Sequence, residues 1–215
     1  SIELEDILVN RLENNGYFYS TASSKFEEKG NKASIKYQLN LTTPYVMKKF
    51  QLDSMPSPLY DDIRVMLEDS PLYKENRFNL SNFKLERQRI DNELKKIGYY
   101  NFNSDFLIFE ADTNQYTKKR FDLYLRLKDN APERAILPYR ISKINIYPQQ
   151  NLRDTTSKNT IEFNNKYYLQ DSVFIKPKYL DKFITLEQGQ MYNPGSSKNT
   201  ARRLSSFDIY KYVNI

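Results

Sequence analysis

The chain has 215 residues, a formal net charge of +6, 18 tyrosines and 13 phenylalanines, and neither cysteine nor histidine. The missing cysteines exclude disulfides and thiolate metal sites, and the missing histidines remove the commonest catalytic base and metal ligand. No run of about 18 apolar residues is present, so the sequence predicts no membrane-spanning helix.

The positive charge is concentrated in the C-terminal part of the chain. Residues 138–215 hold 12 Lys and Arg against 6 Asp and Glu, whereas residues 1–137 hold 21 of each. A basic excess is typical of proteins that bind nucleic acid, an anionic membrane surface or an acidic partner. Here the cations are mostly scattered singly, which fits a solvated basic face as well as it fits a binding site.

The N-terminal stretch predicts a helix followed by a hairpin. Apolar residues recur at helical spacing over residues 1–15, and Gly16 ends this helix. Residues 17–27 form the first expected strand, and Lys29–Gly30–Asn31 supplies a turn. The returning strand, Ala33–Leu41, alternates apolar and polar residues.

The middle stretch predicts a strand, two helices and a second hairpin. The strand covers residues 45–53, and a short helix follows over residues 59–68. The second helix, residues 79–97, presents one apolar face and is followed by Gly98 in the position of a left-handed C-cap. Its face is formed by Leu80, Phe83, Ile90, Leu94 and Ile97. The hairpin 105–110/120–128 completes a strand–helix–helix–strand–strand module.

The end of the second helix repeats an earlier stretch. Three pairs share one offset of 82 residues: Leu12 with Leu94, Gly16 with Gly98, and Tyr17 with Tyr99. A third copy lies in residues 199–215, where Asp208 occupies the glycine position, and aspartate adopts the left-handed conformation less readily. A repeat of this length is typical of small tandem domains rather than a solenoid.

The C-terminal stretch predicts a third, altered module. A strand is expected at 139–147, a polar insertion or loose hairpin at 148–172, helices at 177–184 and 198–207, and a strand beginning at Tyr210. We therefore expect an α+β chain of three units, 1–43, 44–137 and 138–215. The first unit lacks an opening strand and helix and the third lacks its closing strand, so we expect a fragment of a longer protein.

Charged side chains crowd the 79–97 helix, and paired carboxylates occur elsewhere in the chain. Pairs such as Glu86–Arg89 and Asp91–Lys95 stabilise a helix by about 0.2–0.5 kcal/mol each, so we interpret this run as a solvated face. No EF-hand spacing accompanies the paired carboxylates. Tyrosines interleaved with Lys and Arg could stack single-stranded bases, but most fall at expected core positions. The sequence indicates no catalytic residue, metal site or cofactor.

The order of these motifs resembles the POTRA domains of the BamA/TamA outer-membrane assembly superfamily. The residues that carry the resemblance are Glu86, Arg87, Arg89, Leu94, Gly98, Tyr99 and Tyr100, and later Gln188, Gly189, Tyr192, Asn193, Thr200, Arg203 and Leu204. The polar insertion and the phrase Phe109–Thr113 are similar to TamL proteins of the TamA branch. The resemblance implies a three-stranded mixed sheet backed by two helices, a periplasmic location, and a parent chain that continues into a membrane β-barrel.

The resemblance also implies where partners bind. The second strand of each module is an edge strand, whose unpaired backbone groups can accept an added strand. In this sequence these strands are Ser104–Glu110 and Ala22–Glu27, with partner-binding residues Ser104, Asp105, Phe106, Leu107, Ile108, Phe109, Glu110, Ser24, Lys25 and Phe26. The implied partners are nascent outer-membrane proteins and a TamB-like or accessory periplasmic protein. A neighbouring module or the insertion could instead cover these edges.

Alternative functions remain open at this point. Within the same superfamily, the chain could belong to a BamA insertase or a two-partner secretion transporter. A more distant alternative is a single-stranded nucleic-acid-binding module that uses the basic residues 138–215, although the resemblance implies no nucleic-acid partner. Steeply salt-dependent binding to oligonucleotides would indicate that alternative.

Overall fold

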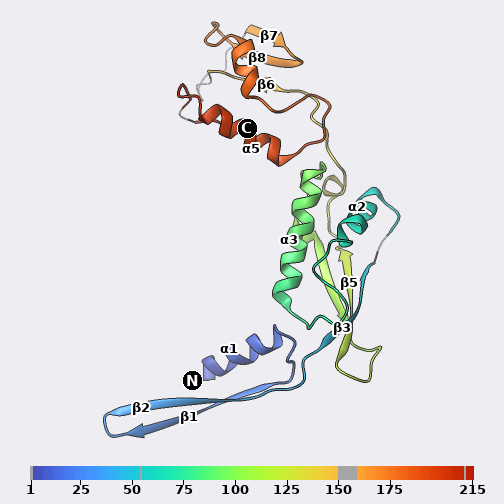
Figure 1. The fold of residues 1–215 in the computed structure, drawn as a ribbon, viewed down its shortest axis with the longest axis vertical. Helices are drawn as coiled ribbons and strands as arrows, with labels where there is room; N and C mark the ends of the chain where they lie inside the picture. Colours follow the sequence, from blue (N-terminus) through green and yellow to red (C-terminus); the bar gives the residue numbers. More distant parts are fainter. Residues whose placement is uncertain (1, 54, 150–158, 211) are drawn as a thin grey trace. The chain divides into compact units, whose positions relative to one another are not determined.

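A computed structural model describes residues 2–53, 55–149, 159–210 and 212–215 (Figure 1). The predicted α+β class is confirmed, and the chain divides into two compact units. The first unit comprises Ser1–Asp91 and Asn103–Ala131, and the second comprises Asn92–Phe102 and Pro132–Ile215. No helix in the described ranges is long and apolar enough to cross a lipid bilayer.

The first unit begins with a helix and a two-stranded hairpin. Helix α1 (Ile2–Glu13) ends shortly before Gly16, which has the left-handed φ of +87° expected there. Strands β1 (Thr21–Lys29) and β2 (Lys32–Asn40) pair antiparallel around a turn at Gly30. Most residues of both strands are exposed, so the hairpin extends with little core beneath it.

The remainder of this unit has the predicted strand–helix–helix–strand–strand order. It consists of β3 (Val46–Leu52), α2 (Pro58–Leu67), α3 (Leu80–Lys96, of which the residues up to Asp91 belong to this unit), β4 (Leu107–Asp112) and β5 (Arg120–Leu127). The sheet order is β3-β5-β4, with β3 parallel and β4 antiparallel to β5. Because parallel neighbours require a crossover connection, the chain passes through α2 and α3 between β3 and the hairpin.

Aromatic and aliphatic side chains from the sheet and α3 form the core of this module. Phe83 on α3 packs with Met47, Phe121 and Leu123 of the sheet and with Leu72. Partly buried rings surround this cluster, and Phe78 contacts Phe83 and Phe121 edge to face. The predicted apolar face of α3 is therefore largely buried. Ile97 is an exception, because it lies beyond the last residue of α3 and is 37% exposed.

The two repeated glycines form junctions with the same hydrogen bonds. The Gly16 carbonyl accepts from the Tyr45 N–H at 2.9 Å, and the Tyr45 carbonyl accepts from the Phe78 N–H at 2.9 Å. In the second unit, the Gly98 carbonyl accepts from the Tyr139 N–H at 2.8 Å, and the Tyr139 carbonyl accepts from the Tyr192 N–H at 2.9 Å. The sequence repeat therefore corresponds to a repeated backbone junction.

These junctions explain why glycine is needed at both positions. Gly98 has a φ of +108°, and an added Cβ would lie 3.1 Å from the Tyr139 carbonyl oxygen. At Gly16 an added Cβ would lie 2.9 Å from the Cβ of Phe78. Leu12 and Leu94 accept the N–H of Tyr17 and Tyr99, respectively, at 3.0 and 3.1 Å, which closes both helices in the same way.

The second unit contains a smaller mixed sheet and two short helices. Strands β6 (Asn145–Ile146), β7 (Asn159–Phe163) and β8 (Lys166–Gln170) are arranged in the order β6-β8-β7. The 3-10 helix η2 (Glu133–Ala135) precedes these strands, and α4 (Pro177–Leu180), the 3-10 helix η3 (Asp181–Phe183) and α5 (Pro194–Ser205) follow them. Tyr168, Ile175 and Leu180 form its buried cluster.

The expectations for this unit were confirmed only in part. The strand predicted at 139–147 is reduced to the two residues of β6 and an isolated bridge at Arg140. The hairpin expected as one reading of the polar insertion is confirmed, because β7 and β8 pair antiparallel and supply most of the sheet; residues 150–158 of the insertion lie outside the described residues. Residues 210 and 212–215 form no strand, and Asp208 is not among the described residues with a positive φ.

Candidate strand-addition edge

Strand β4 lies at the edge of its sheet, because the order β3-β5-β4 leaves it one neighbour. Residues of an antiparallel pair alternately direct their N–H and C=O groups toward the neighbouring strand and away from it. The Lys128 N–H donates to the Phe106 carbonyl at 2.8 Å, in register with the β4–β5 ladder. The backbone N–H and C=O groups of the even-numbered residues of β4 therefore point toward β5. Those of Leu107, Phe109 and Ala111 point away from β5, toward the open edge.

The first outward position is already occupied. The Leu107 N–H donates to the carbonyl of Ser104, which belongs to the 3-10 helix η1 (Ser104–Phe106). The Leu107 carbonyl accepts from Arg87 Nη1, on α3, at 3.0 Å. Within the described residues, the outward groups of Phe109 and Ala111 have no such partners. The open edge of β4 therefore extends from Phe109 to Ala111.

Side chains of β4 alternate between two different surroundings. Leu107 is fully buried, and the Phe109 ring packs 5.4 Å from Phe83 of α3 and 5.9 Å from Phe50 of β3. Ile108 and Glu110 lie on the opposite face, where Glu110 forms an ion pair with Arg126 at 2.8 Å. The apolar run 106–109 thus contributes to both faces, and its inner face is packed against the core.

The C-terminal end of β4 leads into a polar turn. Asp112 Oδ1 accepts from the Asn114 N–H at 2.9 Å and Oδ2 accepts from Gln115 Nε2 at 3.3 Å. These hydrogen bonds, the one from the Asn114 backbone first, lower the pKa of the Asp112 carboxyl. Tyr116 donates its hydroxyl to Asp122 at 2.7 Å, and this bond raises the pKa of Tyr116. The turn is therefore held by local bonds that leave Ala111 uncovered.

The structure changes the boundaries of the predicted edge. Ser104, Asp105 and Phe106 form η1 rather than the start of a strand, because Asn103 caps this turn by accepting the Asp105 N–H at 2.8 Å. The Leu107 N–H is therefore bonded to the Ser104 carbonyl of η1 and is not open to a partner strand. Ala111 lies outside the predicted segment, although it carries open backbone groups.

The second predicted edge lies on β1, which pairs with β2 alone. Ser24 donates to the Glu5 carboxylate of α1, and Lys25 lies 3.6 Å from the carboxylate of Glu27. Phe26 is 57% exposed and lies opposite Ile35, which is 47% exposed. This strand is an edge without a packed core, so its position is less constrained than that of β4.

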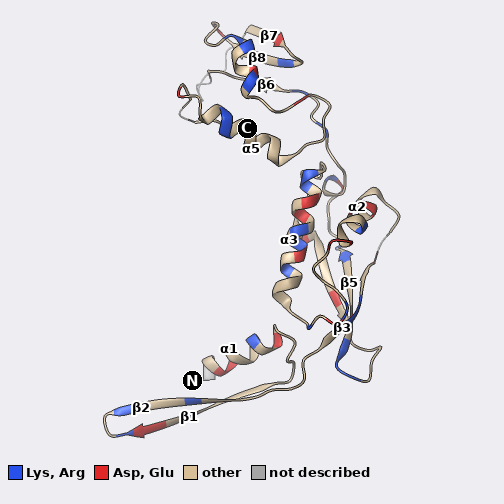
Figure 2. Cartoon of the chain, in the orientation of Figure 1, with Lys and Arg blue, Asp and Glu red and all other residues tan. Residues whose placement is uncertain are grey.

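Acidic and basic residues both occur along α3 (Figure 2). They do not all form a solvated face, contrary to our interpretation of the sequence. Glu86 is fully buried, and its carboxylate accepts two hydrogen bonds from Arg89, at 2.7 and 2.8 Å. Arg89 also donates to the Met66 carbonyl of α2 at 2.8 Å. The Glu86–Arg89 pair therefore links the two helices. The role of Arg87 at the sheet edge was not predicted, because a charge run does not identify which member reaches a backbone.

The described residues contain no group of three or more His, Cys, Asp or Glu side chains that could hold a metal ion. Two acidic residues from the carboxylate-rich stretches of the sequence, Asp61 and Glu110, form ion pairs with arginines. Asp61 pairs with Arg64 at 2.7 Å, and Glu110 pairs with Arg126.

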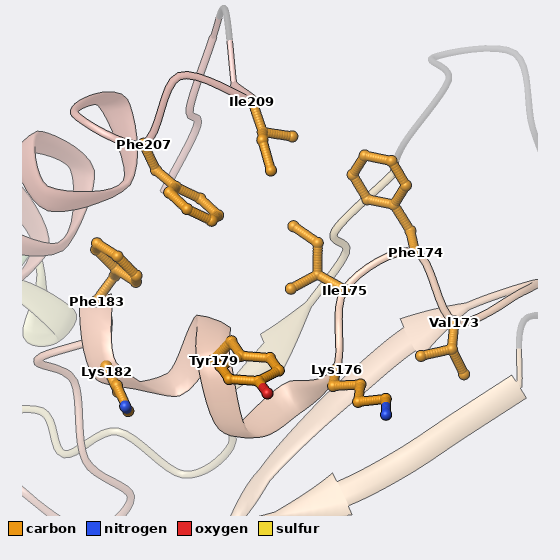
Figure 3. Close-up of a pocket in the computed structure, with 9 residues that line it drawn as sticks. All are labelled: Val173, Phe174, Ile175, Lys176, Tyr179, Lys182, Phe183, Phe207 and Ile209. Carbon is orange, nitrogen blue, oxygen red and sulfur yellow. The ribbon is translucent and has the colours of Figure 1, made fainter.

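A hollow of about 640 Å³ lies in the second unit, lined from α4, η3 and the segment after α5 (Figure 3). Its walls are mainly apolar, and the rings of Phe183 and Phe207 stack 5.0 Å apart. Lys176 and Lys182 also line it. The hollow could bury an apolar group beside two cations. It contains none of the residues that the sequence predicts to bind partners.

Comparison with known proteins gives similarity at the level of solved structures. No family model matches the sequence, and no curated protein matches it. BamA POTRA3-5 from Haemophilus influenzae aligns with 99% of this chain and 71% of its own length, at 13% identity and a TM-score of 0.47. POTRA1-3 of Omp85 from Anabaena aligns with 97% of this chain and 72% of its own length, at 11% identity and a TM-score of 0.31. The N-terminal domain of Omp85 from Thermosynechococcus elongatus aligns with 100% of this chain and 75% of its own length, at 12% identity and a TM-score of 0.31.

Proposed function

We propose that this chain is a periplasmic region of POTRA modules from an outer-membrane protein assembly or translocation factor, of the TamA or TamL type. Support comes from the motif order, from the strand–helix–helix–strand–strand module, and above all from the open edge of β4. A BamA insertase or a two-partner secretion transporter would use the same edge, so these remain the alternatives within the superfamily.

The proposed activity is strand addition without catalysis. An extended partner segment pairs with the outward N–H and C=O groups of Phe109 and Ala111, and main-chain hydrogen bonds supply most of the affinity. Such pairing tolerates many partner sequences, which suits nascent outer-membrane proteins and a TamB-like or accessory periplasmic protein. The packed core beneath Phe109 keeps the edge ordered before the partner arrives.

Replacing Ala111 with proline tests this proposal. Proline removes the outward N–H at an exposed edge position and leaves the β4–β5 ladder intact, because Ala111 does not direct its backbone to β5. Binding is measured by fluorescence anisotropy with a labelled peptide of alternating valine and threonine. One lost hydrogen bond of about 1 kcal/mol predicts binding about five-fold weaker for Ala111→Pro.

The matched control is Ala111→Ser, which keeps the N–H and should bind as the unaltered chain does. Equal affinity of the proline and serine variants, with both folded by circular dichroism, would contradict strand addition at this edge. Tight binding of a single-stranded oligonucleotide to the unaltered chain, falling steeply with log salt, would favour the nucleic-acid alternative instead.

A further inference from the structure

The edge of β4 is open over a short length and has a cation at one end. Arg87 reaches from α3 to the Leu107 carbonyl, at 3.0 Å, and η1 occupies the Leu107 N–H. On the N-terminal side of Leu107 the chain forms η1 and presents no strand edge. A partner strand therefore pairs with Phe109 and Ala111, and its backbone pairing stops opposite Leu107.

Arg87 has donors left for a partner. A guanidinium carries five N–H donors in a planar fork, and the Leu107 carbonyl uses Nη1. Within the described residues Arg87 forms no ion pair. Its neighbour Glu86 is bonded to Arg89, and Asp91, one turn farther along α3, accepts from Gln88 at 3.1 Å. The charge of Arg87 is thus half-buried at the edge without a carboxylate of its own.

The direction of the partner strand follows from the pleat. A partner residue paired with Phe109 places its side chain on the α3 face, because side chains of paired residues share a face. That side chain lies beside the Phe109 ring, where Phe83 and Phe50 form an apolar surface. The residue two positions away returns to the same face, opposite Leu107 and next to Arg87.

We propose that the β4 edge selects an extended protein segment in which an apolar residue is followed two positions later by aspartate or glutamate, added antiparallel to β4. The apolar residue covers Phe109, and the carboxylate binds the free donors of Arg87. Carboxylate is the partner that a guanidinium fork binds best. Antiparallel addition is favoured because antiparallel ladders are slightly more stable than parallel ones. This inference rests on the strand addition proposed above and specifies its register and partner chemistry.

Three labelled peptides test the proposal, each of alternating valine and threonine with one altered step. With both termini blocked, the first peptide ends in Val-Thr-Glu, the second ends in Val-Thr-Gln, and the third begins with the reversed step Glu-Thr-Val. Their affinities are measured by anisotropy for the unaltered chain and for Arg87→Gln, which removes the guanidinium charge. Backbone amide shifts of Phe109 and Ala111, read by NMR, report whether each peptide occupies the edge.

We expect the unaltered chain to bind the Glu peptide about five- to ten-fold more tightly than the Gln peptide, because the bond to Arg87 is charge-assisted. The reversed peptide should bind as weakly as the Gln peptide. In Arg87→Gln the difference between the Glu and Gln peptides should disappear, while the Phe109 and Ala111 amides still shift.

Three results would overturn the inference in distinguishable ways. If all three peptides shift the amides of Phe109 and Ala111 and bind the unaltered chain with equal affinity, strand addition stands and the selection by Arg87 is wrong. If no peptide shifts these amides, both the inference and the proposed function fail. A Glu preference that persists in Arg87→Gln would place the carboxylate on another cation.

Discussion

The two predicted edge strands, β4 and β1, differ in what lies behind them. β4 belongs to a three-stranded sheet whose inner face is buried, with Leu107 fully buried and Phe109 packed against α3. β1 belongs to a two-stranded hairpin on which Phe26 is 57% exposed. We therefore expect β4 to bind a partner strand more tightly than β1, because a strand that is held in position before the partner arrives loses less entropy on binding.

The largest loss of stability should come from truncating a core side chain of the three-stranded sheet, compared with an exposed side chain of the β1–β2 hairpin. Phe121, on β5, lies in the core of the middle module and is 1% exposed. Phe121→Ala should lower the free energy of unfolding by about 3–5 kcal/mol. The matched change Phe26→Ala on β1 should cost less than about 1 kcal/mol, because that ring already faces solvent. Urea unfolding followed by circular dichroism compares them, and equal losses would remove the distinction between the strands.

The junction between the hairpin and the middle module is the next most sensitive point. Gly16→Ala forces a side chain into a φ of +87° and brings its Cβ to 2.9 Å from that of Phe78. We expect a loss of about 1–3 kcal/mol, visible in thermal unfolding. Gly30→Ala is the control, since Gly30 also has a positive φ but has nothing within 4 Å of an added Cβ. Equal losses would show that conformation, not close packing, makes Gly16 necessary.

Loss of the buried carboxylate on α3 should have a smaller effect. Glu86→Gln keeps the shape of the side chain but removes the charge that Arg89 binds, at a cost of about 1–2 kcal/mol. The exposed ion pair between Glu27 and Lys36 of the hairpin provides the comparison. Glu27→Gln removes this ion pair and should cost less than about 1 kcal/mol. A Glu86→Gln protein as stable as Glu27→Gln would indicate that Glu86 contributes little to the link between α2 and α3.

The smallest expected effect is a pH dependence at Glu75 in the middle module. Hydrogen bonds from Lys48 first, and then Arg120, hold the pKa of this carboxyl below its ordinary value of 4.5. Because the folded pKa is lowered, the stabilisation is present above pH 4.5 and is lost as the pH falls through the folded pKa. Glu75→Gln should therefore flatten the acid limb of a stability profile, and an unchanged limb would contradict this role.

The sequence predicted the middle module well because its signals are local. Helical spacing located α3, and glycines marked the two left-handed caps. Alternation located β5, whose Phe121, Leu123 and Leu125 are all buried. The third predicted unit was located less well: a hairpin was among the expectations for its polar insertion, but the alternation at 139–147 produces only the two residues of β6, and residues 210 and 212–215 form no strand.

The start of β4 and the contact of Arg87 with it were also not predictable from the sequence. The apolar run 106–109 indicated a strand, but the start of β4 depended on Asn103 capping η1, a competition between turn and strand that alternation does not reveal. The contact of Arg87 with Leu107 joins residues 20 positions apart, and the buried Glu86 adjoins it in the same charge run. Only the packing of α3 on the sheet distinguishes these neighbours.

Hydrogen exchange at β4 tests the central claim most directly. Without a partner, the amides of Phe109 and Ala111 should exchange fast while those of Ile108 and Glu110, which face β5, exchange slowly. Adding the alternating peptide with the Val-Thr-Glu step should slow exchange at Phe109 and Ala111 and leave β1 unchanged. Slow exchange at Phe109 and Ala111 in the free chain, or protection that develops on β1 instead, would contradict the assignment of β4 as the binding edge.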